Sequence, residues 1–264
     1  MNDFYSGTRP MPLDQADGLR RLFAGAGKRY LPLAANPHVA FGGVAIERLT
    51  AALALQGHHT LIVDACDTAP PAPEAAALEL AACIEALTPQ VSYLPARGLP
   101  LRYVDTRGSS ARLLDELSMA APQADTILVH AGAADLARLF TRRAARPLLL
   151  AADHPESVKH AYASLKLMAQ RCGWLSCDLL LVAPPESPRA APIAASLASC
   201  ADSFLGAAVA GWAAIDPACH AVETPSLDLL RIVAAQLQLD DDPLPAAFVA
   251  ALHAAPASAG AACH

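Results

Sequence analysis

The sequence predicts an α/β domain: a mostly parallel, twisted sheet with helices on both faces. From residue 29 to residue 240, short apolar stretches alternate with segments of helical periodicity. The stretches 60–65, 126–130 and 148–152 are almost continuously apolar, which is typical of strands that are covered on both faces. A length of 264 residues is enough for one large domain with terminal appendages. We therefore divide the chain into an N-terminal tail (1–28), an α/β domain (29–240) and a C-terminal tail (241–264).

The individual elements follow from the periodicity of apolar residues. We expect strands at 30–35, 60–65, within 90–105, and at 126–130, 148–152, 178–183 and 204–210. We expect helices at 44–56, 73–87, 111–120, 155–171, 188–201 and 225–238. The segment after residue 240 is rich in Ala, Pro and His and has no strong periodicity, so we expect it to fray.

Composition narrows the class of protein. Hydrophobic residues make up 54% of the chain and the mean hydropathy is +0.32. No apolar run approaches the roughly 20 residues that a membrane span needs, and the N-terminus has no apolar signal core. A net charge of −6 argues against nucleic acid as a partner, because a phosphate backbone favours a basic surface. We expect a cytoplasmic protein with weak membrane contact or none.

The cysteines predict no metal site. There are seven, an odd number at irregular spacing. Cys172 and Cys177 are five residues apart, and Cys219-His220 and Cys263-His264 follow, but no pair of ligands has the spacing of a zinc motif. We expect most of these thiols to act as small apolar side chains.

A short amphipathic helix is expected at 13–24. Its apolar residues fall at helical spacing, Asp14 lies in the first turn and Arg20 near the end, and both charges suit the helix dipole. Gly18 weakens the helix by about 1 kcal/mol relative to Ala. Because so short a helix is marginal in water, we expect it to dock or to fold on a partner.

The body resembles the MinD/ParA group of ATPases with a deviant nucleotide loop, a P-loop NTPase fold. The resemblance covers roughly residues 13–238 and includes Thr60-Leu-Ile-Val-Asp64-Ala-Cys66 and Asp125-Thr-Ile-Leu-Val-His130. Its other landmarks lie at 53–57, 148–168 and 204–217.

Within this group, the N-terminal element is similar to the DQAxxLR activator of the FlhG/FleN branch, which regulates flagellar number and placement. The resemblance implies that the helix contacts the FlhF-type GTPase and stimulates GTP hydrolysis. Gln15 would orient the attacking water, as catalytic glutamines do in switch GTPases. The residues that carry this expectation are Asp14, Gln15, Ala16, Leu19, Arg20 and Leu22.

The nucleotide loop departs from the family pattern. The GKGGVGKT loop of the family falls on Asn36-Pro-His-Val-Ala-Phe-Gly-Gly43, so that Pro37 and Gly42 replace both lysines and Gly43 replaces the magnesium-binding Thr. A phosphate cradle needs backbone amides and a cation at the β and γ phosphates. No other alignment supplies the cation, because the chain has lysine only at positions 28, 159 and 166.

The acidic positions of the family are also altered. The first Asp of its DAD element is retained as Asp64, but Cys66 replaces the second, and His130 replaces the switch aspartate. Asp67 would point to the other face if the strand continued. We expect Asp64 to be structural and His130 to be a core histidine at a strand end rather than a general base. Likewise Asp153-His154 and Ser157 suggest a catalytic triad only by sequence, and adjacency in sequence is not geometry; Asp and Ser are also common at helix starts, where they cap the helix.

Three functions follow. The first is a non-hydrolysing FlhG-like regulator that activates the GTPase, with ATP and magnesium binding lost. The second is an active MinD/ParA-type ATPase with an unusual site. The third is an α/β interaction module that binds a flagellar transcription regulator or components of the flagellar switch and C-ring. We favour the first, as a monomer that its partners could recruit to the cell pole or membrane.

Overall fold

The computed structural model describes residues 28–239 as one α/β unit. The predicted activator helix at 13–24 and the C-terminal tail at 241–264 lie outside these residues. Eight strands form a single sheet in the order β3-β4-β2-β5-β1-β6-β7-β8. All neighbouring pairs are parallel except β3 and β4. The predicted fold class is confirmed.

The strands have these bounds: β1 Arg29–Ala34, β2 Thr60–Asp64, β3 Glu85–Thr88, β4 Val91–Pro95, β5 Thr126–Ala131, β6 Leu148–Ala152, β7 Ser176–Val182 and β8 Ala208–Ile215. The central strands are buried on both faces, as their continuous apolar sequences predict. In β2, Leu61 and Val63 pack into one core, whereas Ile62 packs into the other.

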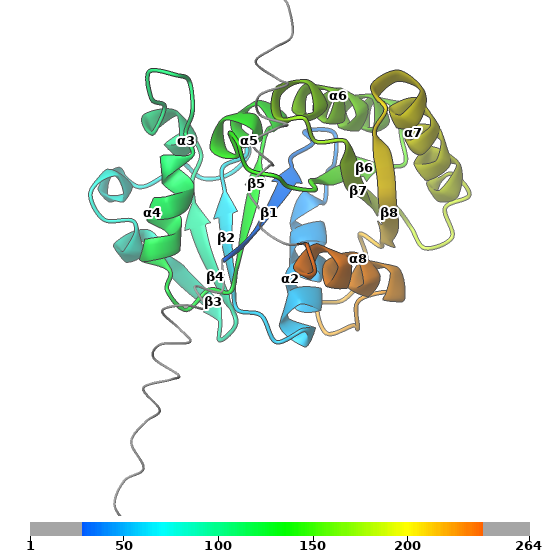
Figure 1. Ribbon diagram of the computed structural model, residues 1–264. Coiled ribbons are helices and arrows are strands. Elements are labelled where there is room, and N and C mark those ends of the chain that lie inside the picture. Colours follow the sequence, from blue (N-terminus) through cyan, green and yellow to red (C-terminus); the bar gives the residue numbers. More distant parts are fainter. Residues whose placement is uncertain (1–27, 240–264) are drawn as a thin grey trace, which may run out of the picture.

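Helices cover both faces of this sheet, as Figure 1 shows. On one face lie α2 (Gly42–Leu55) and α8 (Leu227–Leu237), whose buried side chains share a core with alternate residues of the strands. The other face carries α4 (Arg112–Ala120), α5 (Ala133–Leu139), α6 (Pro155–Cys172) and α7 (Ala190–Leu205). A single turn, α3 (Leu99–Arg102), precedes α4. Among the described residues, no helix is both long enough and apolar enough to cross a bilayer.

The helix predicted at 73–87 is wrong. The segment forms two short 3-10 turns, η1 (Glu74–Ala77) and η2 (Ala81–Cys83), and then strand β3, which pairs antiparallel with β4. Its alanines favour a helix locally, but the pairing of 85–88 with β4 and the burial of Leu80 and Cys83 require an irregular course. Tertiary contacts therefore outweigh local propensity here.

The strand predicted at 204–210 begins too early. Helix α7 continues to Leu205, and Gly206 closes it in the left-handed conformation at φ 61°. Strand β8 then runs from Ala208 to Ile215. The apolar residues Phe204 and Leu205 therefore belong to the last turn of a helix, and the glycine marks the boundary. Helix α5, which follows β5 after one residue, was not predicted at all.

Candidate functional site

The loop between β1 and α2 lies where the phosphate loop of the resembled family would be. Helix α2 begins at Gly42, so the chain enters the helix at the positions aligned with the family's last Lys and Thr. Asn36, at the start of the loop, is buried and ties it to the fold: its Nδ2 donates to the backbone oxygens of Leu150 at 2.8 Å and Ser157 at 2.9 Å. Its Oδ1 accepts from the backbone N–H of His38 at 3.1 Å. The side chain of Asn36 therefore fixes the loop to β6 and α6.

A cavity of about 640 Å³ lies beside this loop at the carboxyl ends of the strands. It brings together all seven residues that the sequence assigned to the altered nucleotide site: Asn36, Pro37, Gly42, Gly43, Asp64, Cys66 and His130. A Cβ atom added at Gly42 or Gly43 would meet no heavy atom within 4 Å. Neither glycine is thus required by packing.

Asp64 and His130 form a partly buried pair within the cavity. Asp64 ends β2 and His130 lies near the end of the neighbouring β5, where the two residues are register partners. His130 Nδ1 lies 2.8 Å from Asp64 Oδ1. The Sγ of Cys66, two residues after Asp64, completes a group whose donor atoms all lie within 4.8 Å of one another.

Asp64 and His130 change each other's pKa. Burial alone would lower the pKa of His130, but hydrogen bonds and charge interactions with Asp64 and Cys66 outweigh it and raise the pKa to about 9. Burial alone would raise the pKa of Asp64, yet the hydrogen bond and charge of His130 hold it below its ordinary value. The imidazolium and carboxylate therefore stabilise each other at neutral pH.

The second acidic residue of the cavity is Asp67. Strand β2 ends at Asp64, so Asp67 lies in the turn that follows and lines the same cavity. The strand does not continue to Asp67, so strand alternation does not decide where this residue lies.

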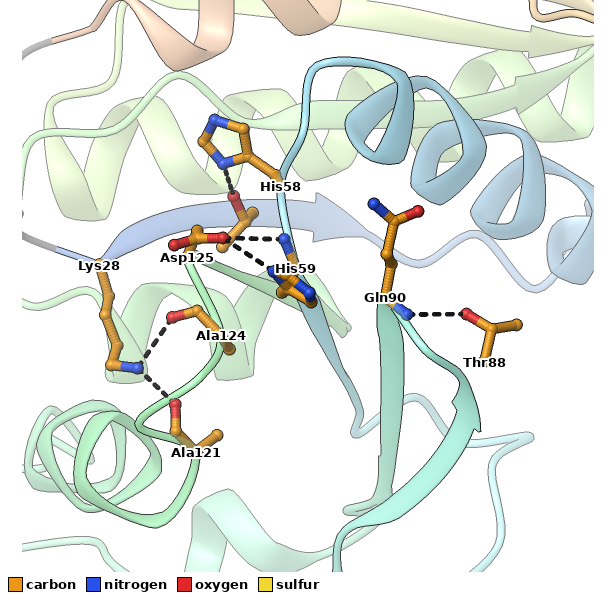
Figure 2. A network of polar contacts seen from close by, with 9 residues as sticks. Lys28, His58, His59, Thr88, Gln90, Ala121, Ala124 and Asp125 are labelled. Atoms are coloured by element: carbon orange, nitrogen blue, oxygen red, sulfur yellow. Dashed lines mark hydrogen bonds and ion pairs between the residues drawn. The ribbon is translucent and has the colours of Figure 1, made fainter.

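No lysine or arginine lines the cavity among residues 28–239; its ionisable residues are Asp64, Cys66, Asp67, His130 and His160. Lys28 lies at the opposite, amino end of the sheet, where its Nζ donates to the backbone oxygens of Ala121 and Ala124 (Figure 2). Lys159 pairs with Glu156 on the exposed surface of α6 at 2.7 Å. The cationic part of a phosphate site is missing from the described lining.

Three histidines gather where the loop meets α6, a feature that the sequence analysis did not predict. The ring of His38 lies edge-on to those of His154 and His160, with centroid separations of 6.3 and 5.8 Å. His154 Nε2 lies 2.8 Å from the backbone oxygen of His38. Burial and the charge of His38 lower the pKa of His160. Their spacing along the sequence gives no signal, because His38 and α6 meet only in the folded chain.

The structure agrees that Asp153, His154 and Ser157 form no catalytic triad. The Oγ of Ser157 accepts hydrogen bonds from the backbone of Ala152 at 2.8 Å and from Asn36. His154 is the N-cap of α6 and accepts from the backbone N–H of Ser157 at 3.5 Å. Asp153 instead accepts from Ser187 Oγ at 2.9 Å. These groups fix the start of α6.

No protein-family model matches the sequence, and no curated protein matches it either. Solved structures do match. MinD of Aquifex aeolicus aligns with a TM-score of 0.53 at 11% identity over 80% of this chain and 98% of its own. A plasmid partition protein from Borrelia burgdorferi bound to AMPPNP gives 0.54 at 10% identity, covering 79% and 96%. An ATP complex of McdA from Cyanothece gives 0.53 at 14%, covering 80% and 97%.

The chain has the MinD/ParA-like P-loop NTPase fold. At identities of 10–14%, these similarities concern the arrangement of strands and helices. Within that arrangement, the altered residues of this chain surround one cavity.

Proposed function

We propose that this protein is a non-hydrolysing regulator of flagellar number and placement, built on a MinD/ParA-like body that no longer binds ATP. The observation that carries the proposal is the lining of the cavity beside the β1–α2 loop, which among the described residues contains two carboxylates and neither Lys nor Arg. The body would serve as a scaffold, and the N-terminal helix would act on the partner.

The physical reason is electrostatic. ATP bound with magnesium needs cationic groups and free backbone amides at its β and γ phosphates. Here Asp64 and Asp67 bring negative charge to the cavity, and the one strongly basic imidazole, His130, is already paired with Asp64. Pro37 has no amide hydrogen to offer, and Gly43 has no hydroxyl for magnesium. The residues present do not fit the nucleotide and its metal, so we assign no ATPase reaction.

The activator role belongs to residues 13–24. Leu19 and Leu22 would provide the apolar anchor on an FlhF-type GTPase, flanked by Asp14 and Arg20. Ala16 would allow close approach, and Gln15 would orient the attacking water. Since the body offers no nucleotide switch, stimulation would not depend on ATP.

Oligomeric state and location follow from the same proposal. In the resembled group, ATP bridges two subunits and each contributes a lysine across the interface. Without that bridge we expect a cytoplasmic monomer of 27.4 kDa, recruited to the pole or membrane through its partners. A flagellar transcription regulator or C-ring proteins are further partners to test.

The direct experiment measures GTP hydrolysis by an FlhF-type GTPase with and without the full-length protein. We expect stimulation that is unchanged by added ATP. Gln15→Ala should abolish stimulation and keep most binding, because a water-orienting group acts mainly in the transition state. Leu19→Ala should weaken binding itself by about 1–3 kcal/mol, on the scale of a buried leucine.

Two matched controls lie on the body. Gln56→Ala removes an exposed glutamine at the end of α2, and Leu78→Ala removes a leucine that is 94% exposed. Both should leave stimulation intact. A GTPase rate that stays unchanged with the full-length protein and with a peptide of residues 1–25 would overturn the activator role and favour the interaction module.

A further inference from the structure

The proposed function leaves the Asp64, Cys66 and His130 cluster without a role. Its three side chains come from two neighbouring strands: Asp64 closes β2, Cys66 follows it in the turn, and His130 lies near the end of β5. Cys66 and His130 are 5% and 7% exposed, and the cluster lines the 640 Å³ cavity. A carboxylate, a thiol and an imidazole gathered at the wall of a cavity form a donor set suited to a transition metal.

We propose that Asp64, Cys66 and His130 bind one Zn²⁺ ion, with a fourth coordination position open to the cavity. The sequence predicted no metal site, because that prediction rested on the spacing of the cysteines along the chain. This site uses one cysteine, and Asp64 and His130 are 66 positions apart in sequence.

The distances suit a tetrahedral ion after a small adjustment. Zinc binds sulfur at about 2.3 Å and nitrogen or oxygen at about 2.0–2.2 Å, which places neighbouring donors about 3.3–3.7 Å apart. The three donor atoms here lie within 4.8 Å of one another, and Asp64 Oδ1 lies 2.8 Å from His130 Nδ1. The hydrogen-bonded pair must therefore open by less than an ångström, and zinc must displace the Nδ1 proton of His130 and the thiol proton of Cys66, both of which are released to solvent.

Neighbouring groups already orient the carboxylate of Asp64 and the thiol of Cys66. Tyr93 Oη donates to Asp64 Oδ2 at 3.4 Å, which leaves Oδ1 directed at the cluster. Thr68 Oγ1 lies 3.1 Å from Cys66 Sγ, and the backbone N–H of Cys66 contacts Asp64 Oδ1 at 3.4 Å. Such outer partners fix the orientation of metal ligands in known sites.

The donor set also selects the metal. Magnesium and calcium prefer oxygen ligands throughout, whereas a thiolate and an imidazole favour zinc and its relatives. Three protein ligands and an open position are the arrangement found in zinc sites that bind an additional small ligand. The cavity would supply the space for a water molecule at that position.

The experiment uses the reduced full-length protein, freed of metal with a chelator and then titrated with Zn²⁺ or Co²⁺. We expect one equivalent of Zn²⁺ to bind, measured by elemental analysis after dialysis. Cobalt should give strong visible bands of a four-coordinate ion and a near-ultraviolet band from thiolate-to-metal charge transfer. An excess of Mg²⁺ should displace neither ion.

Variants locate the site and keep the test independent of folding. Cys66→Ser should remove the charge-transfer band, and Cys66→Ser and His130→Asn should each weaken zinc binding at least tenfold, with the circular dichroism of each variant checked first. Cys200→Ser, a half-buried thiol on α7, is the matched control and should bind as the unaltered chain does. A Cys263→Ala/His264→Ala variant tests the C-terminal pair.

Three results would overturn the site: no stoichiometric uptake, a cobalt spectrum without the charge-transfer band, or loss of uptake only in the Cys263→Ala/His264→Ala variant. The readout does not involve the GTPase, so its failure and that of the activator role are distinguishable.

Discussion

The charged side chains at the two ends of the sheet have different surroundings. Near the amino ends of the strands, three charged residues that precede a strand are already paired: Arg146 with Asp178 of β7, Lys28 with backbone oxygens, and Asp125 with His59. At the carboxyl ends, Asp64, Cys66 and His130 line a cavity. The amino end uses its charges in pairs, whereas the carboxyl end combines the Asp64–His130 pair with the larger cavity.

Two carboxylates, the buried Asp178 and the partly buried Asp64, illustrate the difference. Asp178 is 1% exposed and its Oδ2 is contacted by both Arg146 Nε and Gln236 Nε2 at 2.8 Å. Burial is the largest influence on it and raises its pKa despite these partners. Asp64 has a side chain 16% exposed to the cavity, and His130 holds its pKa below the ordinary value. Asp178 and its partner Arg146 border a cavity of about 280 Å³, whereas Asp64 lies on the wall of the larger cavity of about 640 Å³.

We expect the largest change in the free energy of unfolding from a substitution of Asp178, near the amino end of the sheet. Asp178→Ala leaves Arg146, whose side chain is only 16% exposed, without its partner, so we expect the free energy of unfolding to fall by about 3–5 kcal/mol. Urea denaturation measures the change. Asp228→Ala, which breaks the exposed Asp228–Arg231 pair on α8, is the control and should cause little change. Equal effects in the two variants would mean that the buried pair is not structural.

We expect a smaller loss of stability from a substitution of Lys28. Lys28→Met removes the charged donor to the backbone oxygens of Ala121 and Ala124, shown in Figure 2, and should cost about 1–3 kcal/mol. Lys28→Arg keeps donors at this position and should recover part of the loss. Thermal unfolding of both variants tests the assignment, and a Lys28→Met protein as stable as the unaltered one would contradict it.

We expect the smallest change in stability at the carboxyl end of the sheet, where a substitution should stabilise the protein. Gly43→Ala should stabilise the protein by about 0.4–1 kcal/mol, because the helical glycine has an ordinary φ and open space around its Cβ position. Gly206→Ala is the matched control and should destabilise, since Gly206 ends α7 at φ 61°. A destabilised Gly43→Ala protein would show that the β1–α2 loop still needs its glycine.

Much of the fold could be predicted from sequence because the central strands are short and apolar and their helices are periodic. Stretches such as Thr60–Asp64 and Leu148–Ala152 have little alternative to a buried parallel sheet. The edge of the sheet was not predictable in this way. The alanine-rich segment before β4 favours a helix locally, and only its pairing with β4 makes 85–88 a strand.

The site was predicted residue by residue, but its contacts were not. Asn36, Asp64 and His130 were identified from the resemblance to the family's nucleotide loop, DAD element and switch aspartate, and the structure brings them to one cavity. That Asp64 and His130 are hydrogen-bonded follows from the order of β2 and β5 in the sheet, which a single sequence does not reveal. The same holds for His38, which meets His160 only through the packing of α6 against the loop.

Calorimetry of the full-length protein with magnesium and ATP tests most directly whether this body has lost ATP binding. We expect no saturable heat up to millimolar ATP, because the described cavity lining has two carboxylates and no lysine or arginine. The Borrelia plasmid partition protein, solved with AMPPNP, is the positive control with that nucleotide. A saturable signal with a Kd below about 100 µM, equivalent to roughly 5.5 kcal/mol of binding free energy, would show that ATP still binds and would favour an active ATPase.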